Sequence, residues 1–464
     1  MTGASDTVVQ DAVAHARKAF AAGTTTPLVW RREQLVNLRR MLIEQADRLS
    51  AALQADLGKS SIESHTTELG FCTAEIDHIL ANIDDWVEPQ RVKVPVTQKP
   101  GRAEVLAVPL GVSLIVSPWN YPVHLLVAPL AAALSAGNAV VCKPSEVAEA
   151  TATELALLIP QYLDPEAVHV VTGGPDIAEA LLEQRFDHIF FTGSTAIGRK
   201  VAAAAAPHLT PVTLELGGKS PAIVHASANI DVTARRIVFG RFMNAGQTCV
   251  APDHVLVERG VEDELVTAMV DAVAKFYGDD PRKSPDFGRI VNRRHLDRLQ
   301  GYLDGGGYAA IATGGTVDVE NLYLAPTILT GVDLDAPVMA EEIFGPILPV
   351  VAVDDIESAV AIVRDRPHPL ALYVFADDDD AIDAVVSGTT SGGVCINHTL
   401  MQLAVPGLPF GGVGESGTGA YHGKAGFDVF SHRRSVLRKS TRPDPGIVYP
   451  PYGKVASRLI RHAT

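Results

Sequence analysis

Five β-rich runs follow one another in the first half of the chain: VLAVPLGVSLIVSP (105–118), NAVVCKP (138–144), HVVTGG (169–174), HIFFTG (188–193) and VTLELGG (212–218). Each run ends at Pro or Gly. Ala- and Leu-rich stretches of helical length (127–136, 149–163 and 177–183) lie between most of them. Strands separated by helices need crossover connections, so the pattern predicts a parallel, doubly wound α/β sheet. Ligands bind such sheets beyond the carboxyl ends of the strands.

The same alternation resumes after Gly218. Strand-like runs alternate there with expected helices over 230–241 and 262–276; the runs are PAIVHA (221–226), HVLVER (254–259), ILPVVAV (347–353), ALYVFA (371–376) and GGVCIN (392–397). This pattern predicts a second doubly wound α/β domain.

Two further segments lie upstream of the first sheet. Leucines at helical spacing predict one amphipathic helix over 31–57, closed by Gly58. From Arg91, Val alternates with polar residues around a Lys-Pro-Gly turn, which predicts a β-hairpin. An isolated hairpin is marginally stable, so it must pack on something, and a partner subunit is a good candidate.

Composition and charge narrow the class of protein. The 464 residues are enough for about two to four domains with large cores. Lys and Arg number 39 against 54 Asp and Glu, a net charge of −15. This balance argues against nucleic acid or an anionic membrane surface as the main partner, because both need basic patches. Four Cys in so long a chain cannot form a disulfide framework, so we expect a reducing, cytoplasmic setting.

No stable membrane insertion is expected. The N-terminus has no apolar segment behind a basic start and does not resemble a signal peptide. The longest apolar stretch, 121–141, is interrupted by His124, Pro129 and Gly137, whereas a bilayer span needs about 20 predominantly apolar residues. The C-terminal tail is too short and too polar to span.

One of the four cysteines differs from the others in its setting. Cys72 lies in a helix-like run, and Cys142 and Cys395 lie in strand-like runs, so these three are expected to be buried and inert. Cys249 follows Asn-Ala-Gly-Gln-Thr in a loop just after a helix, where Gly246 permits close backbone approach. A loop cysteine can be incidental, and a nucleophile also needs a base and an oxyanion donor.

Two polar residues are candidates for those roles. Glu215 ends an apolar strand and is followed by two glycines, which leave the carboxylate accessible; partial burial would raise its pKa toward that of a working base. A carboxylate capping a turn is the alternative. Asn120 stands between Trp119 and Tyr121 in a turn stiffened by prolines, and its uncharged amide suits a developing alkoxide. An Asn in a Pro-rich turn can also be purely structural.

A cofactor signal follows the fourth β-rich run. Gly193 and Gly198 give G-x-x-x-x-G, not the G-x-G-x-x-G dinucleotide fingerprint, and no Gly-Lys-Ser/Thr is present. A helix N-terminus nevertheless presents free N–H groups to a phosphate, and Ser194 adds a hydroxyl. Lys143 and Glu146 follow another strand, where they could hold a ribose or form an ordinary surface ion pair.

The Gly-rich segment 406–426 is interpreted as a packing loop near the mouth of the site. His422 within it has no Asp, Cys or His neighbours at ligand spacing, and no metal site is expected anywhere in the chain.

Taken together and in order, these blocks resemble the signature motifs of the aldehyde dehydrogenase superfamily. The blocks are VSPWNYP (116–122), VCKPSE (141–146), FFTGSTAIG (190–198), LELGGKSP (214–221), GQTCVAPD (246–253), EEIFGPILPV (341–350) and PFGGVGESGTGAYHGKAGFDVFSH (409–432). The resemblance covers residues 31–452, nearly the whole chain. GAYHGK, FSHRRSVL and the tail VYPPY look most like the class 3 branch, which oxidises medium- and long-chain or aromatic aldehydes.

The resemblance implies a role for each candidate. Cys249 corresponds to the nucleophile, Glu215 to the general base and Asn120 to the oxyanion donor, and the spacing of 34 residues between base and nucleophile also agrees with the family. The implied reaction is NAD(P)-dependent oxidation of an aldehyde to a carboxylic acid through a thiohemiacetal and a thioester. Water activated by the glutamate hydrolyses that thioester.

The resemblance also implies a cofactor site. Its residues are Lys143 and Glu146 at the adenosine ribose, Gly193 and Ser194 at the pyrophosphate, Trp119 and Gly198 lining the same site, and Glu342 and Phe344 at the nicotinamide ribose. Glu146 would repel a 2′-phosphate and so favours NAD, whereas Lys143 could partly offset that repulsion and allow NADP.

The implied architecture has four parts. Residues 1–90 and 109–216 form the NAD(P)-binding domain, 217–427 the catalytic domain, 91–108 and 428–446 an oligomerisation β element, and 447–464 a C-terminal tail. A short N-terminal arm, as in class 3, favours a homodimer over a tetramer.

Two alternatives are kept. A dehydrogenase that passes the acyl group to coenzyme A is the closest, although relatives of that type usually lack the water-activating glutamate. A non-catalytic binding or structural protein on the same fold is the other, and the intact Cys249, Glu215 and Asn120 argue against it.

Overall fold

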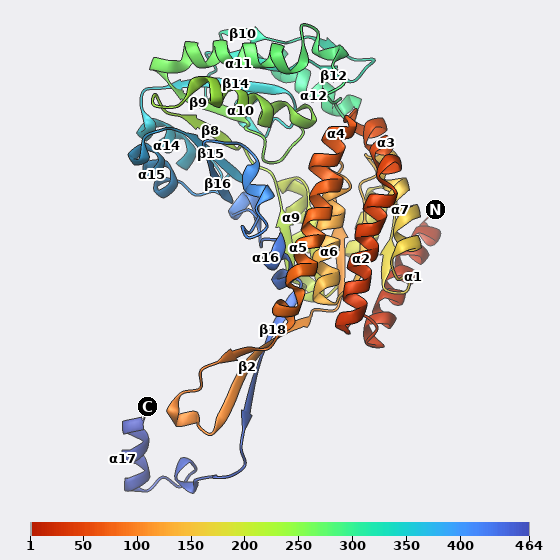
Figure 1. Cartoon of the computed structure of the whole chain (residues 1–464), viewed down its shortest axis with the longest axis vertical. Coiled ribbons are helices and arrows are strands. Elements are labelled where there is room, and N and C mark those ends of the chain that lie inside the picture. The colour runs from red at the N-terminus through yellow and green to blue at the C-terminus, as the bar shows by residue number, and fades with distance from the viewer. Residues whose placement is uncertain (1, 464) are drawn as a thin grey trace.

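The computed structural model describes residues 2–463, which form two α/β units and a projecting β arm (Figure 1). Each α/β unit has its own sheet and its own buried apolar core. The predicted fold class, two doubly wound α/β domains with a small β element, is confirmed. The exact domain boundaries stay a prediction.

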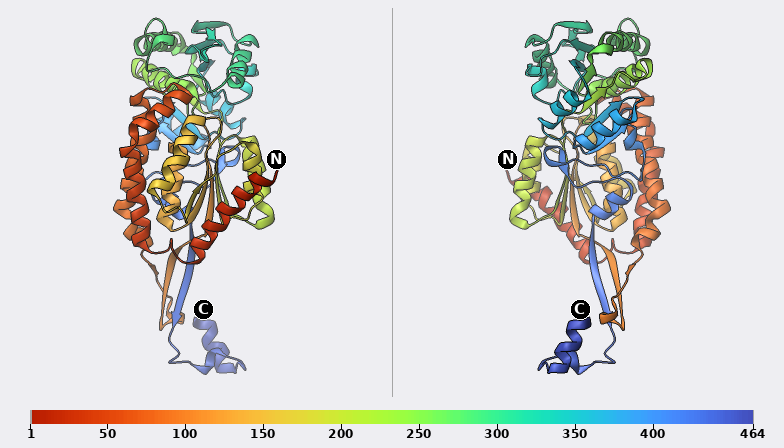
Figure 2. Two further views of the ribbon diagram at one scale, coloured as in Figure 1. Left: turned by 90° about the vertical axis from the view of Figure 1, so that its right-hand side faces the viewer. Right: turned by 90° about the vertical axis from the view of Figure 1, so that its left-hand side faces the viewer.

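The first sheet has six strands in the order β17-β7-β6-β3-β4-β5, and all neighbours are parallel except β17 with β7. Its strands are β3 (Val112–Val116), β4 (Ala139–Lys143), β5 (Val168–Val170), β6 (His188–Thr192), β7 (Val212–Glu215) and β17 (Gly417–Thr418). The crossover helices are α6 (His124–Ala136), α7 (Glu149–Tyr162), α8 (Pro175–Leu182) and α9 (Thr195–Ala205). Helices cover both faces of this sheet (Figure 2), so the strands are apolar on both sides.

The second sheet has seven strands in the order β10-β13-β14-β9-β8-β15-β16, and only β10 runs antiparallel to its neighbour. Its strands are β8 (Pro221–Val224), β9 (His254–Glu258), β10 (Ala310–Thr313), β13 (Thr327–Thr330), β14 (Ile347–Val353), β15 (Ala371–Phe375) and β16 (Gly393–Ile396). The remaining elements of this unit are α10 (Ile230–Phe242), α11 (Glu262–Tyr277), α12 (Arg293–Asp304), β11 (Val317–Asp318), β12 (Tyr323–Leu324), α13 (Pro337–Ala340), α14 (Ile356–Arg364) and α15 (Asp379–Gly388).

An N-terminal helical layer packs on the first unit. It consists of α1 (Thr2–Ala21), α2 (Leu28–Glu44), α3 (Ala46–Leu57), α4 (Ser61–Ser64), a π-helical turn (His65–Leu69) and α5 (Gly70–Val87). The single helix predicted over 31–57 is wrong, because Gln45 leaves the helical conformation (φ −108°, ψ 17°). The side-chain amide of Gln45 donates a hydrogen bond to the hydroxyl of Tyr162 in α7 (2.9 Å) at the point where the helix is interrupted. Gly58 ends α3 in a left-handed conformation, as expected.

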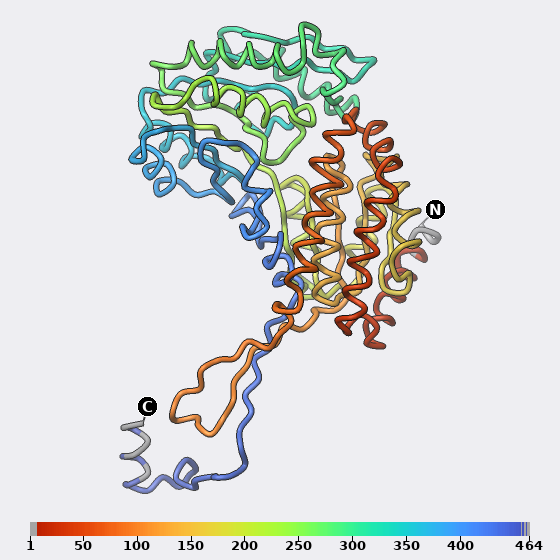
Figure 3. The backbone as a smooth tube through the Cα atoms, viewed as in Figure 1, coloured from red at the N-terminus to blue at the C-terminus, as the bar shows by residue number. Residues whose placement is uncertain are grey.

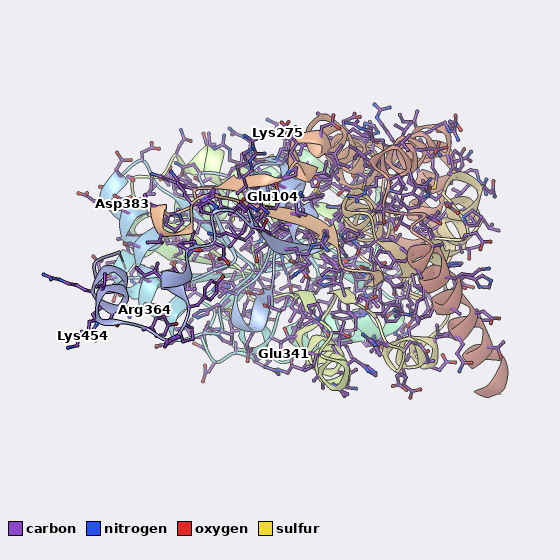
Figure 4. The ribbon with its side chains drawn as sticks, turned by 90° about the horizontal axis from the view of Figure 1, so that it is seen from below. Glu104, Lys275, Glu341, Arg364, Asp383 and Lys454 are labelled. Carbon is purple, nitrogen blue, oxygen red and sulfur yellow. The ribbon has the colours of Figure 1, made fainter. Side chains whose placement is uncertain are left out.

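The arm is a three-stranded antiparallel sheet of β1 (Gln90–Val92), β2 (Gly101–Pro109) and β18 (Ser431–Lys439). The predicted hairpin is present, and β18 pairs with the whole of β2. Helix α16 (Gly423–Val429) leads into β18. Beyond the arm lies α17 (Lys454–Ala463), and the backbone trace shows arm and tail extending away from both units (Figure 3). Lys454 lies at the edge of the molecule (Figure 4).

Within residues 2–463, no helix combines the length and apolar character needed to cross a membrane.

Candidate functional site

A cavity of about 580 Å³ lies between the two units, at the carboxyl ends of β3, β6 and β7. This is the edge of a parallel sheet where ligands bind. Eight of the eleven residues singled out from the sequence line it: Trp119, Asn120, Gly193, Ser194, Glu215, Cys249, Glu342 and Phe344. Segments more than 200 residues apart in the chain therefore meet at one site.

Cys249 is presented by a tight left-handed turn. Helix α10 ends at Phe242, and Asn244, Ala245 and Gly246 then have φ of 52°, 51° and 74°. A left-handed non-glycine residue costs about 1–2 kcal/mol, so the surroundings must hold this turn in place. Only glycine fits at position 246, because a Cβ there would lie 2.3 Å from the Gly345 carbonyl oxygen. The turn breaks the helix and brings the thiol to the cavity wall.

The thiol of Cys249 is held in a setting that favours its protonated form. Burial raises its pKa above the ordinary value, and the nearby carboxylates of Glu342 and Glu215 raise it further. The side chain is half-buried and reaches the cavity. A reaction that uses the thiolate therefore has to work against this environment.

Asn120 is fixed by hydrogen bonds to the same turn. Its side-chain Nδ2 donates to the Gln247 carbonyl oxygen (3.0 Å), and its own carbonyl oxygen accepts from the Asn244 Nδ2 (2.8 Å). Because a primary amide has two N–H donors, one remains for a ligand in the cavity. Asn120 is only 2% exposed, so this donor acts in a largely water-excluded site.

Glu215 is the last residue of β7 and is buried. Neither carboxylate oxygen has a hydrogen-bond partner among the residues that the structure describes. Burial raises the pKa of Glu215 well above its ordinary value. A capping role is thereby contradicted, because a capping carboxylate accepts backbone N–H bonds. A carboxylate near a thiol, with a raised pKa and no hydrogen-bond partner among the described residues, has the properties of a general base.

The cavity also has an aromatic and acidic wall. The Trp119 ring lies 5.3 Å from that of Phe344, edge to face, and 5.0 Å from that of His295. Glu342 is directed at Gly217, whose absent Cβ would lie 2.1 Å from its Oε2. Burial, followed by the charge of Asp253, raises the pKa of Glu342 to about 8.

The model of the aldehyde dehydrogenase family matches residues 1–436. Among curated relatives, a rat protein named as a dimeric NADP-preferring aldehyde dehydrogenase is 47% identical over 432 residues, 93% of this chain and 95% of the relative. Other curated relatives are named as members of aldehyde dehydrogenase family 3.

The chain belongs to the aldehyde dehydrogenase family.

Two solved structures agree. A substrate-bound Staphylococcus aureus AldH has a TM-score of 0.95 and 40% identity, covering 98% of this chain and 99% of that one. An NAD-dependent aldehyde dehydrogenase from Sinorhizobium meliloti has a TM-score of 0.86 and 31% identity, covering 95% and 88%.

The predicted enzyme class and the resemblance to the class 3 branch are thus confirmed. This aldehyde dehydrogenase oxidises an aldehyde with NAD(P). The coenzyme A-acylating and non-catalytic alternatives are not favoured, since the relatives are named as aldehyde dehydrogenases.

The cavity of this aldehyde dehydrogenase fits a dinucleotide at the start of α9. Ser194 occupies the N-cap position with an extended backbone, and its hydroxyl makes no capping bond. The first N–H groups of a helix lack intrahelical partners and attract phosphate. A Cβ at Gly193 would lie 2.6 Å from the Phe191 ring, so packing against that ring requires glycine here. Glu342 lines the same cavity, and its Oε1 is buried and has no partner among the described residues.

Three predicted cofactor residues do not line this cavity. Lys143 and Glu146 form an ion pair at 2.5 Å beyond the end of β4, with Glu146 partly exposed. Gly198 lies one turn into α9 and serves helix–strand packing, because a Cβ there would lie 2.6 Å from the Leu216 side chain. The ribose contacts assigned to Lys143 and Glu146 stay a prediction.

A buried ionic network that the sequence analysis missed holds the loop carrying Glu342 and Phe344. The Lys219 ammonium pairs with Asp253 (2.5 Å) and donates to the Glu341 carbonyl oxygen (3.0 Å). Asp253 accepts from the Ile343 N–H (2.9 Å). The signal was present, because a lysine follows LELGG and an aspartate ends GQTCVAPD, but each reads as an ordinary surface charge when taken alone.

The cysteines differ from expectation at one position. Cys72 and Cys142 are buried, as predicted, and burial raises the pKa of both thiols. Cys395 was predicted to be buried but is half-exposed, because β16 is the edge strand of its sheet. Among residues 2–463, no three His, Cys, Asp or Glu side chains are grouped so that they could hold a metal ion.

Proposed function

We propose that Cys249 is the nucleophile of this enzyme, Asn120 its oxyanion donor and Glu215 its general base. The meeting of these residues in one cavity carries the proposal: an unpartnered buried carboxylate, a free amide N–H and a half-buried thiol come from three distant segments. In covalent catalysis of acyl transfer, these are the three groups required.

The reaction then runs in two halves. The Cys249 thiol loses its proton to solvent, and its sulfur attacks the aldehyde carbon to give a thiohemiacetal whose oxyanion is stabilised by the Asn120 amide and the Cys249 N–H. NAD(P) held in the cavity would supply the acceptor for the hydride that this carbon loses, and a thioester would remain on the Cys249 sulfur. Glu215 takes a proton from water as the water oxygen attacks the thioester, and the carboxylic acid departs with regeneration of Cys249.

The cofactor would lie along the rest of the cavity. The N-terminus of α9, with Gly193 and Ser194, suits the pyrophosphate, and Lys143 with Glu146 the adenosine ribose. Glu342 suits the nicotinamide ribose, because a buried carboxyl group whose pKa is raised can form a hydrogen bond with a ribose hydroxyl. Trp119 and Phe344 supply the aromatic wall beside it.

Activity should rise with pH. Cys249 and Glu215 both act in their deprotonated forms, and the pKa of each is raised in the folded enzyme. The working forms are therefore lost as pH falls, so kcat/KM for an aldehyde should increase steadily between about pH 6 and pH 9. A pH–rate profile at saturating cofactor measures this. A flat or falling profile over that range would contradict the assigned roles.

The enzyme forms a homodimer through its arm. A relative with 47% identity is named as dimeric. The arm leaves the first unit and extends away from both units (Figure 1), and within residues 2–463 strand β18 pairs only with β2, which leaves one long edge open for pairing. Leu437 on this strand is 54% exposed, which suits a contact surface.

Sedimentation tests this assembly. We expect a species of about twice the 49.2 kDa chain mass. Leu437→Glu should shift the equilibrium toward monomer by about tenfold or more, because it places a charge in an apolar contact. Leu157→Glu is the matched control, since Leu157 is 51% exposed on α7, away from the arm. A monomeric native chain, or an equal effect of both variants, would refute the arm as the interface.

The proposed domain division assigns 1–90 and 109–216 to the cofactor, 217–427 to the nucleophile, 91–108 and 428–446 to the arm, and 447–464 to the tail, although β17 within 217–427 completes the first sheet. A cytoplasmic location is proposed as well, because all four cysteines are free and a nucleophilic thiol must stay reduced.

A further inference from the structure

A fully buried ion pair lies behind the Asn120 loop. The Lys59 ammonium and the Glu68 carboxylate are 2.5 Å apart, and neither side chain is exposed to solvent. Lys59 directly follows Gly58, which ends α3, and Glu68 lies in the π-helical turn His65–Leu69. Burying two opposite charges often costs more than their attraction returns, so such a pair is weak evidence for stability alone. Its contacts indicate what else it does.

Glu68 reaches across to the start of α6. Its second carboxylate oxygen accepts hydrogen bonds from the Val123 N–H (2.8 Å) and the His124 N–H (3.1 Å). These N–H groups are at the N-terminus of a helix, where a carboxylate is favoured. Single π-helical turns within a helical segment frequently mark functional sites. Here the π-helical turn belongs to the N-terminal layer, and through Glu68 it is hydrogen-bonded to the segment that follows Asn120.

Lys59 contacts the Asn120 residue directly. Its ammonium donates to the Asn120 carbonyl oxygen (2.9 Å) and lies 3.9 Å from the centre of the Tyr121 ring. The same carbonyl oxygen accepts from Asn244 of the left-handed turn before Cys249. Two donors from opposite sides therefore fix the backbone of Asn120. This oxygen atom is therefore one of the points that join the nucleophile turn to the oxyanion loop, beside the bond from the Asn120 Nδ2 to the Gln247 carbonyl oxygen.

We propose that Lys59 is a positioning residue that holds Asn120 ready for the oxyanion before the aldehyde binds. The inference rests on the proposed role of Asn120 as oxyanion donor. Oxyanion donors act through preorganisation, since a donor that must first reorient loses most of its effect. Lys59 also anchors the loop to an N-terminal layer that contributes no residue to the cavity lining. Through Lys59, that layer supports the loop that carries Asn120.

Two single variants and their combination test this: Lys59→Met, Asn120→Ala and the double variant. Lys59→Met should lower kcat/KM for an aldehyde by about 10- to 100-fold. Alkylation of Cys249 by iodoacetamide should be unchanged, because that displacement forms no oxyanion. Cofactor affinity, read from the fluorescence of bound NADH, should also be unchanged. Arg39→Met is the matched control, since Arg39 pairs with Asp77 (2.6 Å) on the surface of the same helical layer.

The double variant separates positioning from general damage. If Lys59 acts through Asn120, Lys59→Met should cost less than about threefold in the Asn120→Ala background. An equal fold-loss in both backgrounds, or parallel slowing of alkylation, would overturn the proposal. If Lys59→Met does not fold, Lys59→Met/Glu68→Gln avoids an orphaned carboxylate, and the same comparison applies to it. An Asn120→Ala enzyme with full activity would instead refute the proposed role of Asn120.

Discussion

Replacing Cys249 with Ala should lower NAD(P)H production from any aldehyde by about 10⁴-fold or more, because the covalent route disappears with the sulfur. The turn that presents Cys249 is held by Asn120, Asn244 and Gln247, not by the thiol, so the fold and the cavity should survive the change. The rate is measured by absorbance of the reduced cofactor, and NADH binding to the variant should remain normal.

Cys395→Ala is the matched control for this experiment. Cys395 is half-exposed in β16 and belongs to the same unit, but it lies outside the cavity lining. Its replacement should leave turnover unchanged. Substantial aldehyde oxidation by Cys249→Ala would remove the basis of the proposed mechanism, and loss of activity in Cys395→Ala would show that the assay reports thiol damage in general.

Glu215→Gln should slow hydrolysis of the thioester and leave formation of the thioester intact. The amide cannot take a proton from water, so steady-state turnover should fall by about 10²- to 10⁴-fold. Attack by Cys249 and formation of the thioester do not require this base. Rapid mixing should therefore still give a burst of about one reduced cofactor per active site, and mass spectrometry should detect the acyl group on the protein.

A glutamate outside the cavity provides the control for Glu215→Gln. Glu149→Gln changes an exposed glutamate in the first turn of α7 and should have no effect. If the burst falls in Glu215→Gln as far as the steady state does, the carboxylate acts before the thioester forms, and its assignment to hydrolysis is wrong. Added hydroxylamine, a stronger nucleophile than water, should restore part of the turnover by releasing the acyl group.

Local pattern predicted most strands of the two sheets, but no predicted run covers β10, β13 or β17. The runs 347–353 and 371–376 coincide with β14 and β15, because fully buried parallel strands are short apolar segments with clear ends. It was insufficient for Gln45, whose non-helical backbone interrupts a helix that the leucine spacing continues. It was also insufficient for Cys395, because edge position depends on strand order, which periodicity does not contain.

In the candidate site as well, some residues could be predicted from the sequence and others could not. Cys249, Glu215 and Asn120 were found from motifs, and the structure brings them to one cavity. Their supports were not found. The positive φ of Ala245 has no sequence signal, since alanine ordinarily avoids that conformation. Lys59 and Glu68 are nine residues apart and look like solvated charges until the fold buries them together.

The arm has a consequence for the order of events during synthesis. Strand β18 pairs with β2 across more than 300 residues of intervening chain, and both sheets are encoded almost entirely within that interval. A contact of such high sequence separation forms late. The arm can be completed only after the nucleophile, the base and the cofactor surface have left the ribosome. In the proposed dimer, subunits would then pair through the arm only after all residues of the active site have been synthesised.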